Sequence, residues 1–111
     1  MKIVGVTGLH MVTKLTDSVT NHLIVPHSGK DRITTVQSVI IKSENSAARV
    51  TLKTKITGSD KYQDIMDIPV FSGETKIINV PQQLPEYYGM YASSNIAGPT
   101  ITVNGVVAEL G

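Results

Sequence analysis

Two glycine-containing stretches of this 111-residue chain partly resemble the phosphate-binding motifs of nucleotide-binding proteins. Residues 2–10 read KIVGVTGLH, which begins like the strand and glycine turn of a dinucleotide-binding fold. That fold needs a third glycine and a helix whose N-terminus faces the pyrophosphate. Residues 11–15 are too few and too rich in β-formers to supply that helix. Gly29-Lys30 lacks the earlier glycine of a phosphate loop, so we interpret it as a turn.

Histidines and carboxylates are the next candidates for chemistry, but their spacing does not favour a metal site. His22 and His27 are five residues apart, which on one strand places them on opposite faces. Asp64 and Asp67 are three residues apart, so on a regular strand they also face opposite sides. Their surroundings lack the alternating ligands and the glycine of a calcium loop. The absence of cysteine excludes disulfides and a thiol nucleophile. We therefore predict no metal, no cofactor and no catalytic residue, and expect the chain not to be an enzyme.

Tyrosines form the third candidate group, because Tyr87, Tyr88 and Tyr91 lie close together in the sequence. A tyrosine has an apolar ring and a polar tip, which suits surfaces that bind proteins or sugars. On a strand, Tyr87 and Tyr91 would share one face and Tyr88 would lie on the other. The alternative interpretation is structural, with the rings covering the ends of a sandwich.

The composition restricts the class of partner. Charged residues make up 17% of the chain and the formal net charge is +1, which argues against a basic face for nucleic acid. Aromatic residues make up only 5%, so few rings are present on which bases could stack. No apolar run approaches the roughly 18 residues of a membrane span, and the N-terminus lacks the apolar core of a signal peptide. We predict that neither nucleic acid nor membrane is a partner.

Short strand-like runs alternate with turn signals along the whole chain. The turns are rich in Gly, Pro, Asn, Asp and Ser, each of which favours tight backbone bends. This spacing predicts an all-β fold, a two-sheet antiparallel β-sandwich of about eight strands with jelly-roll or immunoglobulin-like topology. The predicted strands are Lys2–Val6, His10–Leu15, His22–Val25, Ile33–Lys42, Arg49–Thr57, Asp64–Val70, Thr75–Val80, Gly89–Ser93 and Thr100–Ala108.

Several strands carry a prediction about their place in the sheets. Val50–Ile56 alternates apolar and polar residues, which predicts one buried and one wet face. Val36–Ile41 is denser in apolar residues and is expected to be central, with both faces covered. Pro69 lacks a backbone N–H, which places its strand at an edge or at a bulge. Asn104-Gly105 predicts either a hairpin turn or a bulge inside one long strand.

The first twenty residues fit the core pattern least well. We divide the chain into residues 1–20, an N-terminal arm or first hairpin, and residues 21–111, the sandwich domain. Apolar side chains of the first segment and the three tyrosines are the candidate partner-binding residues. The set comprises Ile3, Val4, Val6, Leu9, Met11, Tyr87, Tyr88 and Tyr91.

The rest of the chain is a series of short strands and turns in a distinctive order. The series comprises Leu23–Pro26, Gly29-Lys30, Val36–Ile41, Asn45-Ser46, Val50–Leu52, Ile68–Thr75, Met90–Ser94 and Ile101–Val103. Across residues 22–109 it resembles the small β-sandwich accessory proteins of tailed bacteriophage virions, often found with the head proteins. Immunoglobulin-like modules and some carbohydrate-binding sandwiches share much of the same series.

The resemblance implies a non-enzymatic capsid decoration, or cement, protein that binds the outside of the assembled head and stabilises it. Its partner would be the major capsid protein. Its location would be the capsid exterior of the virion, and the host cytoplasm during assembly. A homo-oligomer is also implied, with a trimer suited to a capsid three-fold site. A neck, tail or fibre component of the virion is the alternative of the same class, and a carbohydrate-binding β-sandwich module is the alternative of another class.

Overall fold

The computed structural model describes residues 2–79 and 81–111, and this part of the chain contains nine β-strands and no helix. The other two residues, Met1 of the predicted N-terminal segment and Val80 of the predicted strand Thr75–Val80, lie outside the described residues. The strands are β1 (Ile3–Lys14), β2 (His22–Val25), β3 (Arg32–Lys42), β4 (Ala48–Ile56), β5 (Gln63–Val70), β6 (Thr75–Ile78), β7 (Gln82–Leu84), β8 (Tyr88–Ser94) and β9 (Thr100–Leu110).

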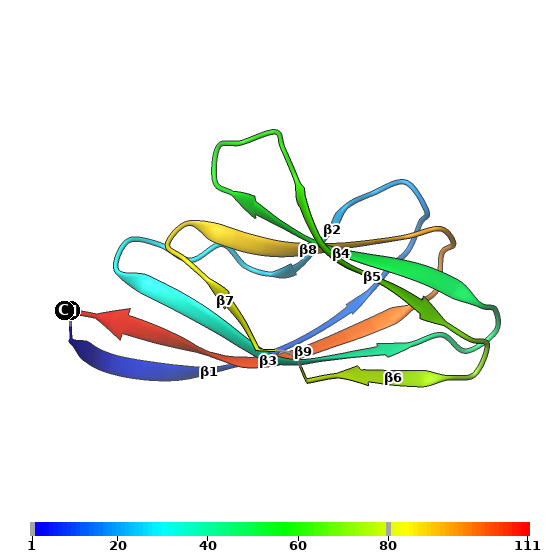
Figure 1. Cartoon of the computed structure of the whole chain (residues 1–111), viewed down its shortest axis with the longest axis horizontal. Helices are drawn as coiled ribbons and strands as arrows, with labels where there is room; N and C mark the ends of the chain where they lie inside the picture. The colour runs from blue at the N-terminus through cyan, green and yellow to red at the C-terminus, as the bar shows by residue number, and fades with distance from the viewer. Residues whose placement is uncertain (1, 80) are drawn as a thin grey trace.

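The strands form two antiparallel sheets that stack face to face (Figure 1). The larger sheet has the order β1-β9-β3-β6, with β7 also paired to β3, and the smaller sheet has the order β2-β8-β4-β5. Because β6 and β7 pair with successive parts of β3, they fill one position, and eight positions result. The chain crosses between the sheets at every connection except β4–β5 and β6–β7. This is the strand order of a jelly roll, which decides between the two predicted topologies.

The core lies between the sheets and is made by alternate residues of each strand. In β4, Val50, Leu52 and Thr54 are buried while Thr51 and Lys53 lie on the outer face, as the alternation predicts; Ile56, which the same pattern places on the buried face, is exposed at the end of the strand. Each fully buried Val, Leu or Ile contributes about 1.5–3 kcal/mol of transfer free energy. The buried apolar residues are Leu15, Ile24, Val25, Val36, Val39, Ile41, Ala48, Val50, Leu52, Ile68, Val70, Leu84, Met90, Ala92, Ile101 and Val103.

The N-terminal segment differs from the two short strands predicted for it. Residues 3–14 form the single strand β1, which pairs with β9 from Ile3↔Leu110 to Lys14↔Thr100, with one irregularity between Ile3 and Gly5. Glycine is the usual strand-breaking signal, but backbone pairing with a long neighbour carries the strand through Gly5 and Gly8. In this structure residues 3–14 are thus an edge strand of the larger sheet and not two arms of a hairpin.

Asn104-Gly105 also lies inside one long strand, as the second alternative predicted, but the bulge is on the partner strand β3 and not at this pair. β9 runs straight through this pair, and the register shift lies opposite, between Val36 and Ser38 of β3. A Cβ atom at Gly105 would lie 2.2 Å from the carbonyl oxygen of Thr35. Glycine is therefore required here by the close approach of two backbones.

The remaining strand predictions had mixed outcomes. β5, which contains Pro69, is the edge strand of the smaller sheet, as predicted. β3 is central in its sheet, but the prediction that both its faces are covered was wrong. Its outward residues, such as Thr35 and Ile40, are only half-buried because no second layer lies over them. The segment between the predicted strands Thr75–Val80 and Gly89–Ser93 contains a further short strand, β7, which was not predicted.

The loop from β1 to β2 carries the chain from the larger to the smaller sheet. The Asp17 carboxylate accepts hydrogen bonds from the Thr20 hydroxyl at 2.7 Å and from the backbone N–H groups of Thr20 at 2.7 Å and Val19 at 3.0 Å. The side-chain and backbone bonds from Thr20 hold the pKa of Asp17 below its usual value. After this turn, β2 pairs with β8 at the edge of the smaller sheet.

Candidate interaction surfaces

The outer face of the larger sheet is uncharged over most of its area; we call it the neutral face. Its residues are Val6, Gly8, His10 and Val12 of β1, Thr100, Thr102, Asn104, Val106 and Ala108 of β9, Ile33, Thr35, Ser38 and Ile40 of β3, and Ile77 of β6. Lys14 and Lys42 flank Thr100 at one end of the face. Between these lysines and the other end, the described strand positions on this face carry no Asp, Glu, Lys or Arg.

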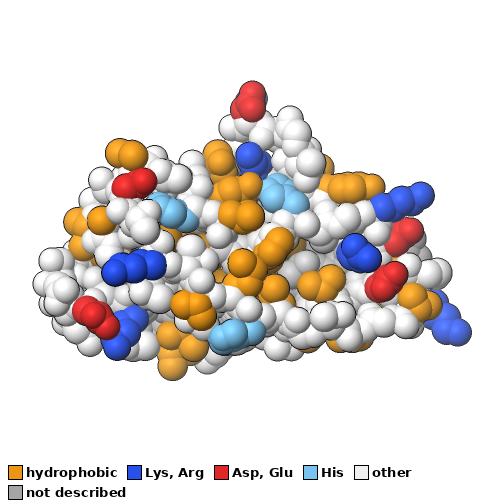
Figure 2. Space-filling model, turned by 180° about the vertical axis from the view of Figure 1, so that it is seen from behind, with side chains coloured by type: hydrophobic (Ala, Val, Ile, Leu, Met, Phe, Trp, Pro, Cys, Tyr) orange, Lys and Arg blue, Asp and Glu red, His pale blue; other side chains and the backbone are white. Residues whose placement is uncertain are grey.

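Large apolar side chains on the neutral face are well exposed. Val12 and Ile77 are each 60% exposed, and Val6 is 64% exposed. Figure 2 views the sandwich from behind Figure 1, along the edges of the two sheets, and shows hydrophobic side chains gathered in the middle of this side of the molecule. Grouped exposed apolar residues of this kind are typical of surfaces that bind other proteins.

The free edge of β1 adds unpaired backbone groups to this surface. Within the described residues, β9 is the only strand paired with β1. In an antiparallel pair, every second residue directs its N–H and C=O to the partner strand. Leu15 N–H donates to the Pro99 carbonyl at 2.8 Å, which shows that the odd-numbered residues do so here. Odd-numbered residues of β1 from Gly5 onward therefore direct their backbone groups to β9. The backbone groups of Val6, Gly8, His10 and Val12 point away from the sheet.

The outer face of the smaller sheet is charged, and its side chains bind one another. The Arg49 guanidinium donates to the Asp67 carboxylate at 2.8 Å, and the Lys53 ammonium donates to Asn21 Oδ1 at 2.9 Å. The Lys55 ammonium lies 4.9 Å from the ring centre of Tyr62, a cation–π contact. This face is therefore largely satisfied by its own contacts.

Tyr91 lies on this charged face, next to Tyr62. The two rings are perpendicular, with centroids 5.0 Å apart, and Lys55 is 5.3 Å from the Tyr91 ring. Stacked sugars need a flat exposed ring, whereas these rings pack edge to face and are covered by an ammonium group. Sequence reasoning missed Tyr62 and His27 as neighbours of Tyr91, because strands distant in sequence bring them together.

The three predicted tyrosines do not form one surface. Tyr88 is half-buried and packs against the core. Tyr87 precedes β8 and has a positive φ of 70°, so its exposed ring does not share a strand face with Tyr91. The predicted sharing of a face by Tyr87 and Tyr91 was wrong, since it assumed that the strand begins before Tyr87.

His27 holds the backbone of Tyr87 in this left-handed conformation. His27 Nδ1 lies 2.8 Å from the Tyr87 carbonyl oxygen, and its Nε2 lies 2.7 Å from the Tyr91 hydroxyl. The Thr57 hydroxyl also donates to the Tyr87 carbonyl, at 2.9 Å. With a proton on Nδ1, every donor in this group has an acceptor, so we assign it a structural role.

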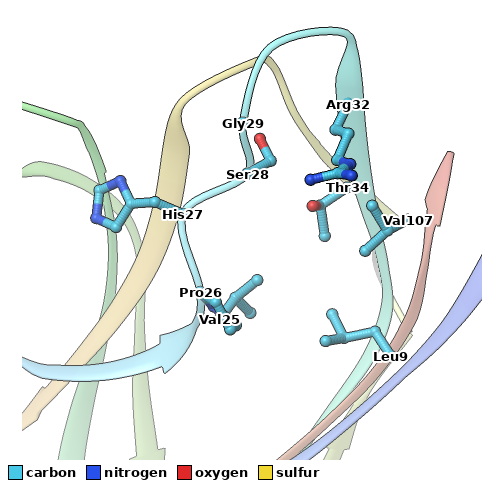
Figure 3. A pocket seen from close by; sticks show the side chains of 9 residues that line it. All are labelled: Leu9, Val25, Pro26, His27, Ser28, Gly29, Arg32, Thr34 and Val107. Atoms are coloured by element: carbon cyan, nitrogen blue, oxygen red, sulfur yellow. The ribbon is translucent and has the colours of Figure 1, made fainter. Parts of the chain in front are cut away.

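A small pocket opens between the sheets at one end of the sandwich (Figure 3). Leu9 and Val107 line it from the larger sheet, and Val25 and Pro26 line it from the smaller one. Figure 3 shows the Arg32 guanidinium directed to the pocket and the His27 imidazole directed away from it. Its volume of about 160 Å³ is below the roughly 300 Å³ at which typical small-molecule sites begin.

A larger and more open groove lies over the smaller sheet. Its volume is about 370 Å³, and polar side chains line it, among them Asn21, Arg49, Ser93 and Asn95. Across residues 2–79 and 81–111, no three His, Asp or Glu side chains come together as a metal site would require. In the same residues no helix has the length and hydropathy needed to cross a membrane.

The N-terminal candidate residues divide between the two sides of β1. Ile3, Val4 and Val6 are exposed, whereas Leu9 and Met11 point to the inner side and are half-buried, with Leu9 against the core. Val12 and Ile77 are equally exposed and were not among the predicted residues. The even spacing of Val4, Val6 and Val12 is the signal that could have revealed Val12. Whether any of these residues binds a partner stays a prediction.

Comparison with known proteins identifies the fold class. No protein-family model matches the chain, and no curated protein matches it in sequence. Solved structures do share its fold, including a chain of Bacillus endospore appendages, described as disulfide-linked pili. That chain has 12% identity and a TM-score of 0.57, and the match covers 96% of this chain and 89% of the other.

Two further neighbours have different roles. One is a Clostridium thermocellum xylanase 10B chain with CBM22-1 and GH10 modules, solved with xylohexaose. It has 12% identity and a TM-score of 0.56, and the match covers 96% of this chain and 26% of the xylanase chain. A chain of infectious bursal disease virus, Gx strain, has 9% identity, 95% and 34% coverage and a TM-score of 0.53. This chain thus spans about a quarter of the xylanase chain and a third of the viral chain. At these identities the likeness shows a shared β-sandwich fold.

Proposed function

We propose that this chain is a non-enzymatic structural protein of a virion, and in particular a capsid decoration protein that binds the outside of an assembled head. The observation that carries the proposal is the neutral face, where exposed valines and Ile77 lie beside threonines with few charges. Such a surface gains free energy when a partner covers it, at about 25 cal/mol per Å² of apolar area. The charged face, in contrast, has little to gain from a partner.

The fold supports this proposal in a general way. Jelly rolls recur in viral capsid proteins, and sandwiches of this kind also occur among the pilus and virus structures to which the chain is similar. A protein that binds only the assembled shell stabilises it by mass action, and many copies on one lattice add avidity to weak contacts. The partner would be the major capsid protein, and the location the capsid exterior after assembly in the host cytoplasm.

Co-sedimentation of the purified protein with mature and immature shells of the same virus tests the proposal. We expect the wild-type protein to pellet saturably with mature shells. Ile77→Lys should lower the affinity for shells at least about tenfold (1.4 kcal/mol), and Leu23→Lys should leave it unchanged. Leu23 is the matched control because it is an exposed apolar residue on the outer face of the smaller sheet. Wild-type protein that stays in the supernatant would exclude decoration, and equal effects of the two variants would exclude the neutral face.

Glycan binding is the second candidate, and one observation favours it. The open polar groove over the smaller sheet offers Asn, Ser and Arg side chains on the face that also carries Tyr91. A glycan array probed with wild-type protein and with Ser93→Trp, which fills the groove, tests this candidate. Binding lost in the variant would favour a carbohydrate-binding module. A neck, tail or fibre location would instead give binding to tails and not to shells.

A further inference from the structure

We infer that two copies of this chain pair through the free edges of their β1 strands, antiparallel and about a two-fold axis at Leu9. The inference goes beyond the proposed function and does not depend on it. An edge strand with free N–H and C=O groups is a template for another strand, and natural proteins usually protect such edges. The edge of β1 is the least protected of the four sheet edges.

The other three edges each carry a protective feature. β5 contains Pro69, and its outward residues Asp64 and Asp67 are charged. β2 and β6 are each only four residues long. β1 has 12 residues, contains no proline, and carries no charged residue between its start at Ile3 and Lys14 at its end.

The side chains of β1 favour one register with itself. With the two-fold axis at Leu9, Val6 of one copy lies opposite Val12 of the other, and Gly8 lies opposite His10. All four of these residues direct their backbone groups outward, so each pair can exchange two N–H···O=C bonds. The valine pairs meet on the neutral face, and each imidazole has a glycine opposite, where space is free.

Neighbouring registers are less favourable. A shift that centres the axis on His10 places the two imidazoles opposite each other and brings Val6 opposite Lys14. A shift that centres it on Gly8 leaves Val12 opposite Val4, where the irregularity between Ile3 and Gly5 interrupts the ladder. In the register centred on Leu9, Lys14 of one copy faces Val4 of the other, and the lysines of the two copies stay apart.

Pairing in this register would join the two larger sheets into one continuous sheet with a neutral face of twice the area. The strand contact itself would bury less than the roughly 1,200 Å² of standard stable complexes, so we expect a dimer whose population depends on concentration. Backbone bonds fix the direction of pairing, and the valine pairs fix the register.

Charged residues introduced at the two valine pairs test the register. In Val6→Lys/Val12→Lys and in Val6→Glu/Val12→Glu, like charges would face each other in both pairs. In Val6→Glu/Val12→Lys, opposite charges would face each other. Because Val6 and Val12 are 64% and 60% exposed, each variant should retain the wild-type far-UV circular dichroism and melting temperature within a few degrees.

Sedimentation velocity of the full chain from micromolar to about millimolar concentration gives the readout. We expect wild type and the opposite-charge variant to dimerise, and both like-charge variants to dimerise at least tenfold more weakly. A monomeric wild type throughout this range, or four proteins with equal dimer constants, would overturn the inference. So would failure of the opposite-charge variant to dimerise more strongly than the like-charge pair.

Hydrogen exchange provides a second measurement that needs no variant. The amides of Gly8 and His10 should gain protection as wild-type concentration rises, whereas those of Thr7 and Leu9, which face β9, should be protected at every concentration. Concentration-independent exchange at Gly8 and His10 would also overturn the inference. Shell binding is tested on Ile77, at the opposite edge of the sheet, so the two proposals can fail separately.

Discussion

The two outer faces of the sandwich are built from the same kind of strand but are satisfied in different ways. On the smaller sheet, side chains bind each other through the Arg49–Asp67 ion pair, the Lys53–Asn21 hydrogen bond and the rings below Lys55. On the larger sheet, outward side chains are mostly apolar or small. His10 pairs with Asn104 at 2.6 Å within the face, and Lys42 pairs with Glu44 at 3.4 Å at its end.

This difference assigns the two outer faces different roles, one in folding stability and the other in binding. Outer side chains of the smaller sheet contribute to folding, so replacing them should cost stability. Outer side chains of the larger sheet contribute little to folding, because the backbone ladder and the inner face hold that sheet. Its outer residues are therefore free to be used for binding, and the following experiments test the separation.

Gly105→Ala should give the largest effect, because it acts on the backbone that holds the larger sheet. The new Cβ would meet the Thr35 carbonyl at 2.2 Å and force β9 and β3 apart. We expect a loss of about 3 kcal/mol or more in the free energy of unfolding, measured by urea denaturation. Gly8→Ala is the control, since a Cβ there meets nothing within 4 Å. Equal losses would contradict the close approach.

Ile78→Thr and Ile77→Thr compare the two faces of one strand. Ile78 packs against the core, so its replacement should cost about 1–2 kcal/mol in lost burial and a buried hydroxyl. Ile77 is exposed on the neutral face, so its replacement should change stability by less than about 0.5 kcal/mol. Thermal melts of both variants decide this, and a larger loss for Ile77→Thr would reverse the assignment of faces.

Tyr91→Phe tests whether the charged face contributes to folding. It removes the hydroxyl that lies 2.7 Å from His27 Nε2, and we expect a loss of about 1 kcal/mol. Tyr87→Phe is the matched control, because the described residues offer its hydroxyl no hydrogen-bond partner. Chemical denaturation should show a clear loss in the free energy of unfolding only for Tyr91→Phe. Equal unfolding curves for the two variants would mean that the Tyr91 hydroxyl does not stabilise the fold.

Arg49→Gln should have the smallest effect on the charged face. Both partners of its ion pair with Asp67 are about half exposed, so water and salt screen the attraction. We expect about 0.5 kcal/mol at low salt, decreasing as salt is added. A double-mutant cycle with Asp67→Asn measures the coupling, and a coupling that persists in 1 M salt would mean that contacts other than charge are involved.

Local patterns in the sequence predicted most of the individual strands. Alternation in Val50–Ile56 predicted the buried and wet faces from Val50 to Lys55, because a strand directs successive side chains to opposite sides. Pro69 predicted an edge strand or a bulge, since proline cannot donate to a ladder on its N–H side, and β5 is an edge strand. Both arguments need only the residue and its immediate neighbours, which is why they succeeded.

Interactions between distant residues decided the rest. Residues 3–14 became one strand because β9, almost a hundred residues later, supplies backbone partners across Gly5 and Gly8. The grouping of Tyr91 with Tyr62 and His27, and of Ile77 with the valines of β1, depends on which strands are neighbours. The sequence by itself determined an all-β chain with alternating faces. Only the tertiary structure decided which outer face is neutral and which edge is open, because strand order is set by long-range pairing that no local pattern records.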